Sequence, residues 1–253
     1  MKLYDMHCHL ELMSNAAEVS RDAAQLGIGL LDATVTPAAF AQARKIHADA
    51  PAVRVAAGLH PWWLDDGRCD RTDIEMLVAQ ITSCPYVGEV GLDFSQRHAA
   101  SADLQTEAFD AIVQACASHP LPGRLLTIHA VRATGTVLDV LERHGLDRSA
   151  ACIIHWFSGT SDELTRARRV GCLFSINGRM LATKRGREYA RVIPEDSLLL
   201  ETDAPPGDGP YSALAIKDEL EETLSHLAEI RGVDACELGK RIVERSAALL
   251  AID

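Results

Sequence analysis

The sequence has 253 residues, 47% of them hydrophobic, so it can bury a large core, and we expect a single domain at residues 1–253. Its 36 acidic and 25 basic residues give a formal net charge of −11, which excludes a global positive field that would attract nucleic acid or an anionic membrane. Any polyanionic substrate must then be held locally, by metal ions and a few cationic side chains.

The beginning of the chain and the cysteines indicate the compartment. A charged residue and a strand-like run open the sequence, without an apolar stretch of signal-peptide length. No run approaches the roughly 18 consecutive apolar residues of a membrane span. Seven scattered cysteines without a Cys-x-x-Cys pair argue against a disulfide framework. We expect a soluble, cytoplasmic protein without membrane contact, and the sequence leaves its oligomeric state open.

Short aliphatic and β-branched runs alternate with longer amphipathic segments along the chain. A helix is expected from Ser14 to Gln25, with Ser14 as its N-cap and Gly27 as its C-terminal stop. Another is expected to begin near Ser161 and to end before Gly171. The alternation predicts strands at residues 3–8, 28–36, 52–60, 86–92, 125–130, 151–157, 172–177 and 197–203.

Several of the predicted strands are almost entirely apolar, as parallel strands buried on both faces are. Residues 151–154 and 197–200 are examples. Repeated βα units of this kind favour an α/β fold of the (β/α)8 class, the TIM barrel, over a doubly wound sheet. After the last strand, the helical spacing of Leu220, Leu224 and Leu227 predicts a helix, and an extra C-terminal helix is expected at 235–250. Both helices are expected to cover the barrel wall.

Two histidines lie at the end of the first predicted strand, His7 and His9. Residues i and i+2 of a strand point to the same face, so both imidazoles can converge on one metal ion. Cys8 lies between them and is expected to point to the opposite face and pack in the core. The pair alone does not distinguish a metal site from two hydrogen-bonded structural histidines.

Further ligand-type residues lie at or near the ends of later strands. A buried imidazole or carboxylate is costly unless it is paired or coordinated, so the repetition predicts one shared site. The carboxyl ends of the strands are also where (β/α)8 barrels place their active sites. These residues are Glu89, His129, His155 and Asp203.

Six motifs follow one another in the order of the predicted strands: residues 5–9 (Asp5-Met6-His7-Cys8-His9), 58–61 (Gly58-Leu59-His60-Pro61), 88–93 (Gly88-Glu89-Val90-Gly91-Leu92-Asp93), 128–129 (Ile128-His129), 155–159 (His155-Trp156-Phe157-Ser158-Gly159) and 201–205 (Glu201-Thr202-Asp203-Ala204-Pro205). Together they resemble the motifs of the TatD family of metal-dependent deoxyribonucleases, within the amidohydrolase-like barrels. Their agreement in order across Leu3 to Pro205 makes a chance match improbable.

The resemblance implies a barrel of the metallo-dependent hydrolase type, a centre with two divalent metal ions per chain, and hydrolysis of phosphodiester bonds, typically in DNA. Carried over by position, His7, His9, Glu89 and Asp203 would hold one metal ion. Glu89, His129 and His155 would hold the second, with Glu89 bridging. Imidazole and carboxylate ligands suit Zn²⁺, Mn²⁺ or a similar ion, with Mg²⁺ as the alternative.

The catalytic prediction concerns Asp203, together with the bridging Glu89. Asp203 lies on the last strand, where related barrels place the carboxylate that orients the attacking water and accepts its proton. The alternative is that Asp203 is only a metal ligand or a helix cap. We expect catalysis rather than capping.

Substrate contacts are predicted for residues near these ligands. His60 could contact the scissile phosphate or could be a capping histidine, and Asp93 is expected to accept a hydrogen bond from a ligand histidine. Ser158 and Gly159 could present backbone N–H groups to an anion. Trp62 and Trp63 could stack on a base, but packing is the favoured interpretation. The histidines away from strand ends are assigned to the surface: His47, His98, His119, His144 and His226.

Two segments depart from the family pattern. Relatives commonly have His-x-Arg after the fifth strand, whereas this chain has His129-Ala130-Val131-Arg132, which moves the expected substrate-binding Arg132 by one position. The loop at 206–211 lacks the usual arginine and Asn-(Glu)-Pro segment. These departures affect the expected substrate contacts more than metal binding.

The leading hypothesis is a metal-dependent deoxyribonuclease, acting as an exonuclease because one deep site at a barrel mouth suits a strand end. A 3'–5' exonuclease is one form of this hypothesis, and the sequence leaves the polarity of cleavage open. A second hypothesis is an amidohydrolase-type enzyme acting on a small amide, lactone or phosphoester, which the acidic charge favours. A third, prompted by the altered 206–211 loop, is a non-catalytic, metal-stabilised subunit of a larger assembly.

Overall fold

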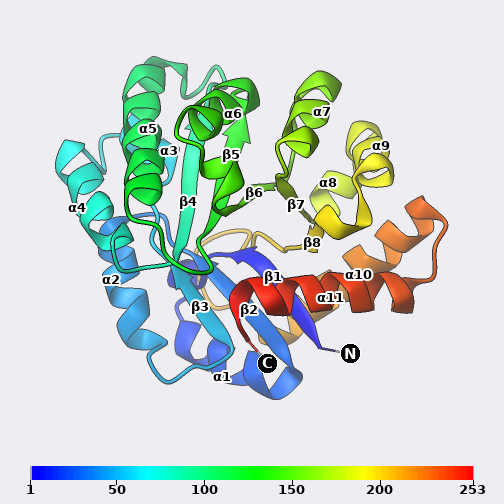
Figure 1. Cartoon of the computed structure of the whole chain (residues 1–253). Helices are drawn as coiled ribbons and strands as arrows, with labels where there is room; N and C mark the ends of the chain where they lie inside the picture. The colour runs from blue at the N-terminus through cyan, green and yellow to red at the C-terminus, as the bar shows by residue number, and fades with distance from the viewer. Residues whose placement is uncertain (1, 253) are drawn as a thin grey trace.

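Parallel strands form the centre of the fold, and helices surround them (Figure 1). The computed structural model describes residues 2–252. The strands are β1 (Leu3–Cys8), β2 (Ile28–Ala33), β3 (Val53–Ala56), β4 (Tyr86–Asp93), β5 (Leu125–Val131), β6 (Ala151–His155), β7 (Leu173–Ile176) and β8 (Leu198–Leu200). Each of the eight matches a strand predicted from the sequence.

The helices follow the strands in the alternation that the sequence predicts. The α-helices are α1 (Ala16–Leu26), α2 (Pro37–Ile46), α3 (Pro61–Asp65), α4 (Arg71–Ile81), α5 (Ala102–Ser118), α6 (Thr134–Arg143), α7 (Ser161–Arg169), α8 (Gly178–Leu181), α9 (Lys184–Val192), α10 (Ala213–Arg231) and α11 (Ala235–Leu250). Short 3-10 helices are η1 (Leu10–Leu12), η2 (Ala99–Ser101), η3 (Leu146–Arg148) and η4 (Glu195–Ser197). Within residues 2–252, no helix has both the length and the apolar character needed to cross a membrane.

Two seams close the barrel. The strands form regular parallel ladders in the order β1-β2-β3 and β4-β5-β6-β7-β8. Between β3 and β4, Gly88 donates its N–H to the carbonyl of Ala57 at 2.9 Å. Between β8 and β1, Asp203 donates its N–H to the carbonyl of His7 at 2.9 Å. This closure confirms the predicted (β/α)8 class.

Most predicted strands extend too far at their carboxyl ends. The prediction of 28–36 exceeds β2, and that of 52–60 exceeds β3. Beyond these strands the backbone continues to pair irregularly, since Glu89 donates its N–H to the carbonyl of Thr34 at 3.0 Å and His60 to that of Val35 at 2.9 Å. The residues that follow the strands therefore bend over the barrel mouth instead of continuing the ladder.

The helix boundaries agree with the sequence at glycines and differ at one cap. Gly27 has φ of 72° and ends α1, as predicted. Ser14 is not the N-cap, because a helix capped by Ser14 would begin at residue 15, whereas α1 begins at Ala16. The N–H of Ser14 instead donates to the carbonyl of Gly209. Asn15 takes the cap position, and its side chain contacts Glu18 and Tyr211. α7 begins at Ser161 after a capping box formed by Thr160 and Glu163.

The amino end of the barrel is closed by the end of the chain. Met6, Leu31 and Ile153 belong to a buried apolar cluster that includes Leu250 and Ile252. The hydroxyl of Tyr4 donates to the carbonyl of Ile252 at 2.8 Å. α11 thus reaches the end of the barrel (Figure 1), which corrects the expectation that it lies only on the wall. The strands' carboxyl ends are left for the site.

Candidate metal centre

The carboxyl ends of the strands surround a cavity of about 650 Å³. His60 from the segment after β3, Glu89 from β4 and His129 from β5 line this cavity. His155 from β6 and Asp203 from the segment after β8 complete the ring. Parallel strands bring their last residues to one edge of a barrel, so residues up to two hundred positions apart become neighbours.

Glu89 lies at the centre of this group and is almost fully buried. Its Oε2 atom faces Nε2 of His7 and Nε2 of His9, each at 3.3 Å. Its Oε1 atom faces Nδ1 of His129 at 2.8 Å and Nε2 of His155 at 2.9 Å. The two oxygens of one carboxylate therefore serve two different pairs of histidines.

Hydrogen bonds at Nδ1, the ring nitrogen away from Glu89, hold the rings of His7 and His9 in place. Nδ1 of His7 contacts the hydroxyl of Thr127, and Nδ1 of His9 contacts the carbonyl of Ala33, both at 2.6 Å. Because a carbonyl only accepts, the His9 Nδ1 donates, and Nε2 is the ring nitrogen left to face the cavity. Cys8 is fully buried, with its thiol toward the Leu31 carbonyl, as expected for a core side chain.

Asp203 faces the same histidines from the segment after β8, the strand next to β1. Its Oδ1 atom lies 3.3 Å from Nε2 of His9 and 3.9 Å from Nε2 of His7. Its Oδ2 atom accepts a hydrogen bond of 3.1 Å from Arg179. Asp203 has φ of 57°, a left-handed conformation that is uncommon outside glycine and that re-aims the side chain after β8.

His129 and His155 each have a carboxylate behind the ring. Nε2 of His129 lies 3.3 Å from Asp93, so Asp93 is positioned to accept a hydrogen bond from a ligand histidine. Nδ1 of His155 lies 3.6 Å from the fully buried Glu201. Sequence reasoning assigned no role to Glu201, although its place at the end of the last strand, before Thr202, was the available signal.

His60 takes one of the two roles that the sequence left open, the helix cap, and also faces Glu89. Its Nδ1 atom accepts a hydrogen bond from the N–H of Trp62 at 3.1 Å and caps α3. Its Nε2 atom lies 3.2 Å from Oε1 of Glu89. His60, Glu89 and His129 thus form a group of ligand-type atoms that the sequence did not predict.

The charges in the site favour an ionised Glu89. Burial would raise the pKa of Glu89, but the neighbouring His60, His155 and His7 hold it well below its usual range. Burial would lower the pKa of His9, but the hydrogen bond to Asp203 and the charge of Glu89 raise it to about 10. Burial lowers the pKa of His60 to about 4 against the attraction of Glu89. Carboxylates thus concentrate negative charge among imidazoles that can bind either a proton or a metal ion.

The residues fit a metal centre by their donor atoms. Nε2 of His7 is buried and has no hydrogen-bond partner among the described residues, and it points to Glu89. Two groups of ligand-type atoms share Glu89, and the atoms of each group lie within 4.8 Å of one another. One group contains His7 and His9, and the other contains His60 and His129. Histidine nitrogens and carboxylate oxygens suit Zn²⁺ or Mn²⁺ better than Mg²⁺.

The predicted substrate contacts divide into those at the cavity and those away from it. Ser158 and Asp93 line the cavity. Gly159 does not, and it is buried where a Cβ would meet Phe157 at 2.8 Å, so this glycine is required for packing. Arg132 is exposed and is not among the residues that line the cavity. The structure therefore does not bring Gly159 or Arg132 to the metal centre.

Two of the histidines assigned to the surface are buried, so those assignments are wrong. Nδ1 of His47 contacts the hydroxyl of Ser20 at 2.8 Å, and its ring lies near Asp32. Nδ1 of His98 pairs with Asp65 at 2.9 Å. Their partners come from other helices and strands, which helical context alone does not reveal. His119 and His226 are exposed, and His144 is half-buried.

Trp62, Trp63 and Trp156 also line the cavity. Trp62 is 38% exposed, donates its indole N–H to Asp93 at 2.7 Å, and stacks on His98 with ring centres 5.1 Å apart. Trp156 follows His155 with φ of 40°. Packing, the favoured interpretation of Trp62, is therefore incomplete, because this ring also faces the cavity.

Comparison with known proteins identifies relatives of this chain. A sequence model of the family described as TatD related DNase matches residues 4–251. The 3'-5' ssDNA/RNA exonuclease TatD of Pantoea vagans is 32% identical over 205 residues, covering 78% of this chain and 77% of that protein. The Deoxyribonuclease Tat-D of Schizosaccharomyces pombe is 34% identical over 118 residues, covering 47% of this chain and 37% of that protein.

Solved structures share the fold over nearly the whole chain. The TatD homologue YJJV of Escherichia coli K12 superposes with a TM-score of 0.83 at 22% identity, covering 99% of this chain and 98% of that one. An uncharacterized amidohydrolase of Saccharomyces cerevisiae superposes with a TM-score of 0.72 at 17% identity, covering 98% of this chain and 99% of that one. At these identities the likeness establishes the barrel and its connectivity.

Proposed function

The chain belongs to the TatD related DNase family, and from this premise we propose that it is a metal-dependent hydrolase that cleaves phosphodiester bonds in DNA. The observation that carries the proposal is that the two carboxylate oxygens of Glu89 face two separate pairs of histidines. A carboxylate shared in this way could hold two metal ions close together, as two-metal hydrolysis of a phosphodiester requires.

We propose two divalent ions per chain. His7, His9, Glu89 and Asp203 would hold one ion, and Glu89, His129 and His155 would hold the other. His60 lies close enough to Glu89 to join the second group or to contact a phosphate. Zn²⁺ or Mn²⁺ suits this donor set. Bound divalent ions supply positive charge that offsets the charge of a phosphodiester and make water a better nucleophile near neutral pH.

The side chains around the ions would position the reactants. Asp203 directs one oxygen to His9 and the other outward, so Oδ2 can orient the attacking water and accept its proton. Asp93 and Glu201 lie behind His129 and His155, where they fix the orientation of the two rings. Trp62 offers an aromatic face at the cavity wall on which a nucleobase can stack.

We propose that single-stranded DNA is the substrate and that the chain acts from a 3' end. A net charge of −11 disfavours extended binding along a polyanion, which supports engagement of a few nucleotides at a strand end. The exonuclease activity named for the Pantoea relative supports the same direction. Seven unpaired thiols favour a reducing compartment, and we propose the cytoplasm.

The test is a substrate screen with purified protein loaded with Mn²⁺ or Zn²⁺. Single-stranded DNA labelled at the 5' end should be shortened stepwise from the 3' end, and bis(4-nitrophenyl) phosphate should be hydrolysed. A panel of lactones and small amides serves as the comparison. Hydrolysis of a lactone or amide with intact DNA across all tested ions would replace the nuclease function with that of an amidohydrolase. Strong metal binding without any hydrolysis would favour the non-catalytic subunit.

A further inference from the structure

The Arg179 side chain is hydrogen-bonded to Oδ2 of Asp203, the carboxylate oxygen that does not face His9. Its Nη1 atom donates to Oδ2 of Asp203 at 3.1 Å, while Oδ1 of the same carboxylate faces His9. Asp203 is the one hydrogen-bond acceptor of this guanidinium among residues 2–252. In the structure, therefore, the oxygen proposed to orient the attacking water already has a partner.

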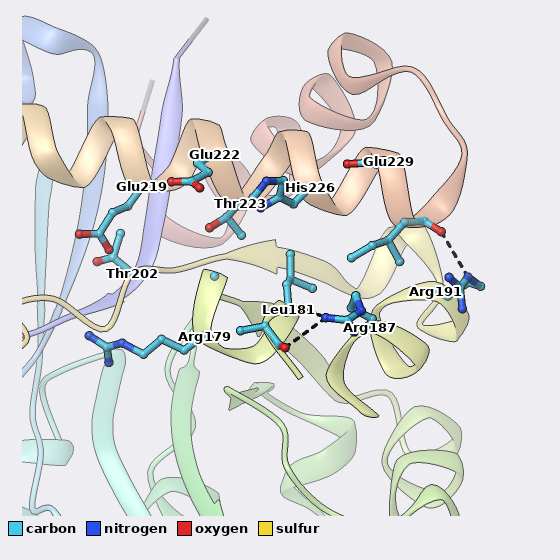
Figure 2. A pocket seen from close by; sticks show the side chains of 13 residues that line it. Arg179, Leu181, Arg187, Arg191, Thr202, Glu219, Glu222, Thr223, His226 and Glu229 are labelled. Carbon is cyan, nitrogen blue, oxygen red and sulfur yellow. Dashed lines mark hydrogen bonds between the residues drawn. The ribbon is translucent and has the colours of Figure 1, made fainter. Parts of the chain in front are cut away.

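The Arg179 side chain has room to change that partner. It is 43% exposed, and its guanidinium carbon lies 5.4 Å from the centre of the Trp156 ring. Arg179 lines the metal cavity and also a second cavity of about 770 Å³ between α8, α9 and α10. Figure 2 shows Arg179 extending away from Arg187 and Arg191, which stay within the second cavity. The guanidinium thus lies between two open spaces.

The other arginines of the second cavity are held by the backbone. Arg187 donates to the carbonyls of Leu181 and Ala182, and Arg191 donates to that of Ile230. The facing wall carries Glu219, Glu222 and Glu229, which offset the charges of the three arginines, so this cavity presents no excess of positive charge to a nucleic acid strand (Figure 2). Of the three arginines, Arg179 is the one that can meet a phosphate in the metal cavity.

A phosphodiester offers Arg179 a competing partner. Guanidinium N–H groups match phosphate oxygens as well as they match a carboxylate, and often with two hydrogen bonds. When Arg179 moves to the phosphate, Oδ2 of Asp203 becomes free to accept a hydrogen bond from water. A neutral ester or lactone in the cavity lacks the charge that would draw Arg179 away.

We propose that Arg179 makes the site selective for anionic esters by exchanging Asp203 for a phosphate oxygen when substrate enters. The inference rests on the proposed function, in which Asp203 orients the water. Arg179 therefore acts both as a contact to substrate charge and as a positioning residue for Asp203.

The kinetic test compares two substrates with the same leaving group. Bis(4-nitrophenyl) phosphate carries one negative charge, and its methyl triester carries none. Arg179→Ala should lower the ratio of kcat/KM for the anion over the triester by about tenfold or more, and Arg179→Lys should restore part of it. Arg185→Ala is the matched control, because Arg185 is an exposed residue of α9 that lines neither cavity. A ratio in Arg179→Ala equal to that in Arg185→Ala would overturn the inference.

A binding measurement provides a readout independent of turnover. A thymidine dinucleotide with its natural link is compared with the same dinucleotide bearing an uncharged methylphosphonate link, by tryptophan fluorescence and without added metal. Arg179→Ala should reduce the preference for the charged link, whereas Arg185→Ala should keep it. Equal loss of affinity for both ligands in Arg179→Ala would reject the exchange.

The two proposals can fail separately. If the wild type leaves DNA intact but shows an Arg179-dependent preference for the charged link, the nuclease function is rejected and the charge selectivity stands. If the wild type degrades DNA while Arg179→Ala changes neither ratio, the selectivity is rejected and the nuclease function stands.

Discussion

Nε2 of His9 and Oε2 of Glu89 lie 3.3 Å apart in a site whose later histidines all face the other oxygen, Oε1. The first strand and the strands β5 and β6 thus meet at a single carboxylate. Replacing one of its oxygens should therefore affect both groups of histidines.

We expect Glu89→Gln to lose metal from both positions, because an amide carries no charge and offers one acceptor oxygen instead of two. His155→Ala should lose mainly one ion, since it removes a single ligand from one group. Elemental analysis after extensive dialysis measures the ions per chain. Glu107→Gln, on the exposed face of α5, is the matched control and should keep the wild-type content. Wild-type content in Glu89→Gln would exclude the bridge.

We expect metal binding to release protons. Hydrogen bonding to Asp203 and the charge of Glu89 raise the pKa of His9 to about 10 against the effect of burial, so the ring is protonated at pH 7.5 without metal. A ligand imidazole must lose that proton, and the apparent affinity should rise by about tenfold per pH unit for each proton released. Calorimetry in two buffers of different ionisation enthalpy counts the protons. Binding without proton release would contradict this prediction.

The same raised pKa predicts the opposite trend for the stability of the protein without metal. A histidine with a folded-state pKa above 6.5 stabilises the fold fully below pH 6.5 and loses that contribution as the pH rises toward 10. The free energy of unfolding without metal should therefore fall between pH 6.5 and 10. Urea titrations at several pH values measure it, and a flat profile over this range would argue against a protonated His9.

Asp203→Asn should reduce kcat by roughly a hundredfold to ten-thousandfold, because an amide cannot accept the proton of the attacking water. The KM for a short oligonucleotide should change much less if the main role of Asp203 is catalytic. Asp208→Asn, in the exposed loop that follows, removes the same charge away from the metal cavity and serves as the control. Comparable rates in the two variants would exclude Asp203 as the group that accepts the proton of the attacking water.

Hydrolysis of single-stranded DNA should depend weakly on salt. With few cationic side chains at the cavity, we expect contacts to two or three phosphates, and each contributes a slope of about −0.7 in a plot of log affinity against log salt. The total slope should thus lie between about −1.4 and −2.1. A series of KM values between low and moderate salt measures it. A much steeper slope would reveal a longer binding track than the metal cavity provides.

The sequence predicted those parts of the site that depend on strand order. His7, His9, Glu89, His129, His155 and Asp203 all follow apolar runs, and the geometry of a parallel barrel is sufficient to bring such positions together. The (β/α)8 class follows from the same alternation. Both inferences use only local periodicity and the rule that parallel strands end at one edge.

The missed features depend on how helices and loops pack, which periodicity does not encode. His98 is buried because α3 brings Asp65 and Trp62 against it. His60 faces Glu89 because it also caps α3. Arg132, which follows the motif at β5, remains outside the cavity, whereas Arg179 reaches Asp203 from α8. Long side chains on loops take directions that residue spacing cannot specify.

The position of the site at the two seams of the barrel means that bound metal ions would also stabilise the closure of the barrel. Ala57 and Gly88 join at one seam, and His7 and Asp203 join at the other, each through isolated hydrogen bonds rather than a long ladder. The histidines and carboxylates of the centre come from strands on both sides of each seam, so bound ions would cross-link the strands there. We expect the amides of Gly88 and Asp203 to exchange hydrogen with solvent faster after chelation, since ligand binding stabilises the closed barrel by mass action. A barrel closed in this way would lose its substrate site and its circular closure together, so chelation would loosen the scaffold as well as halt the chemistry.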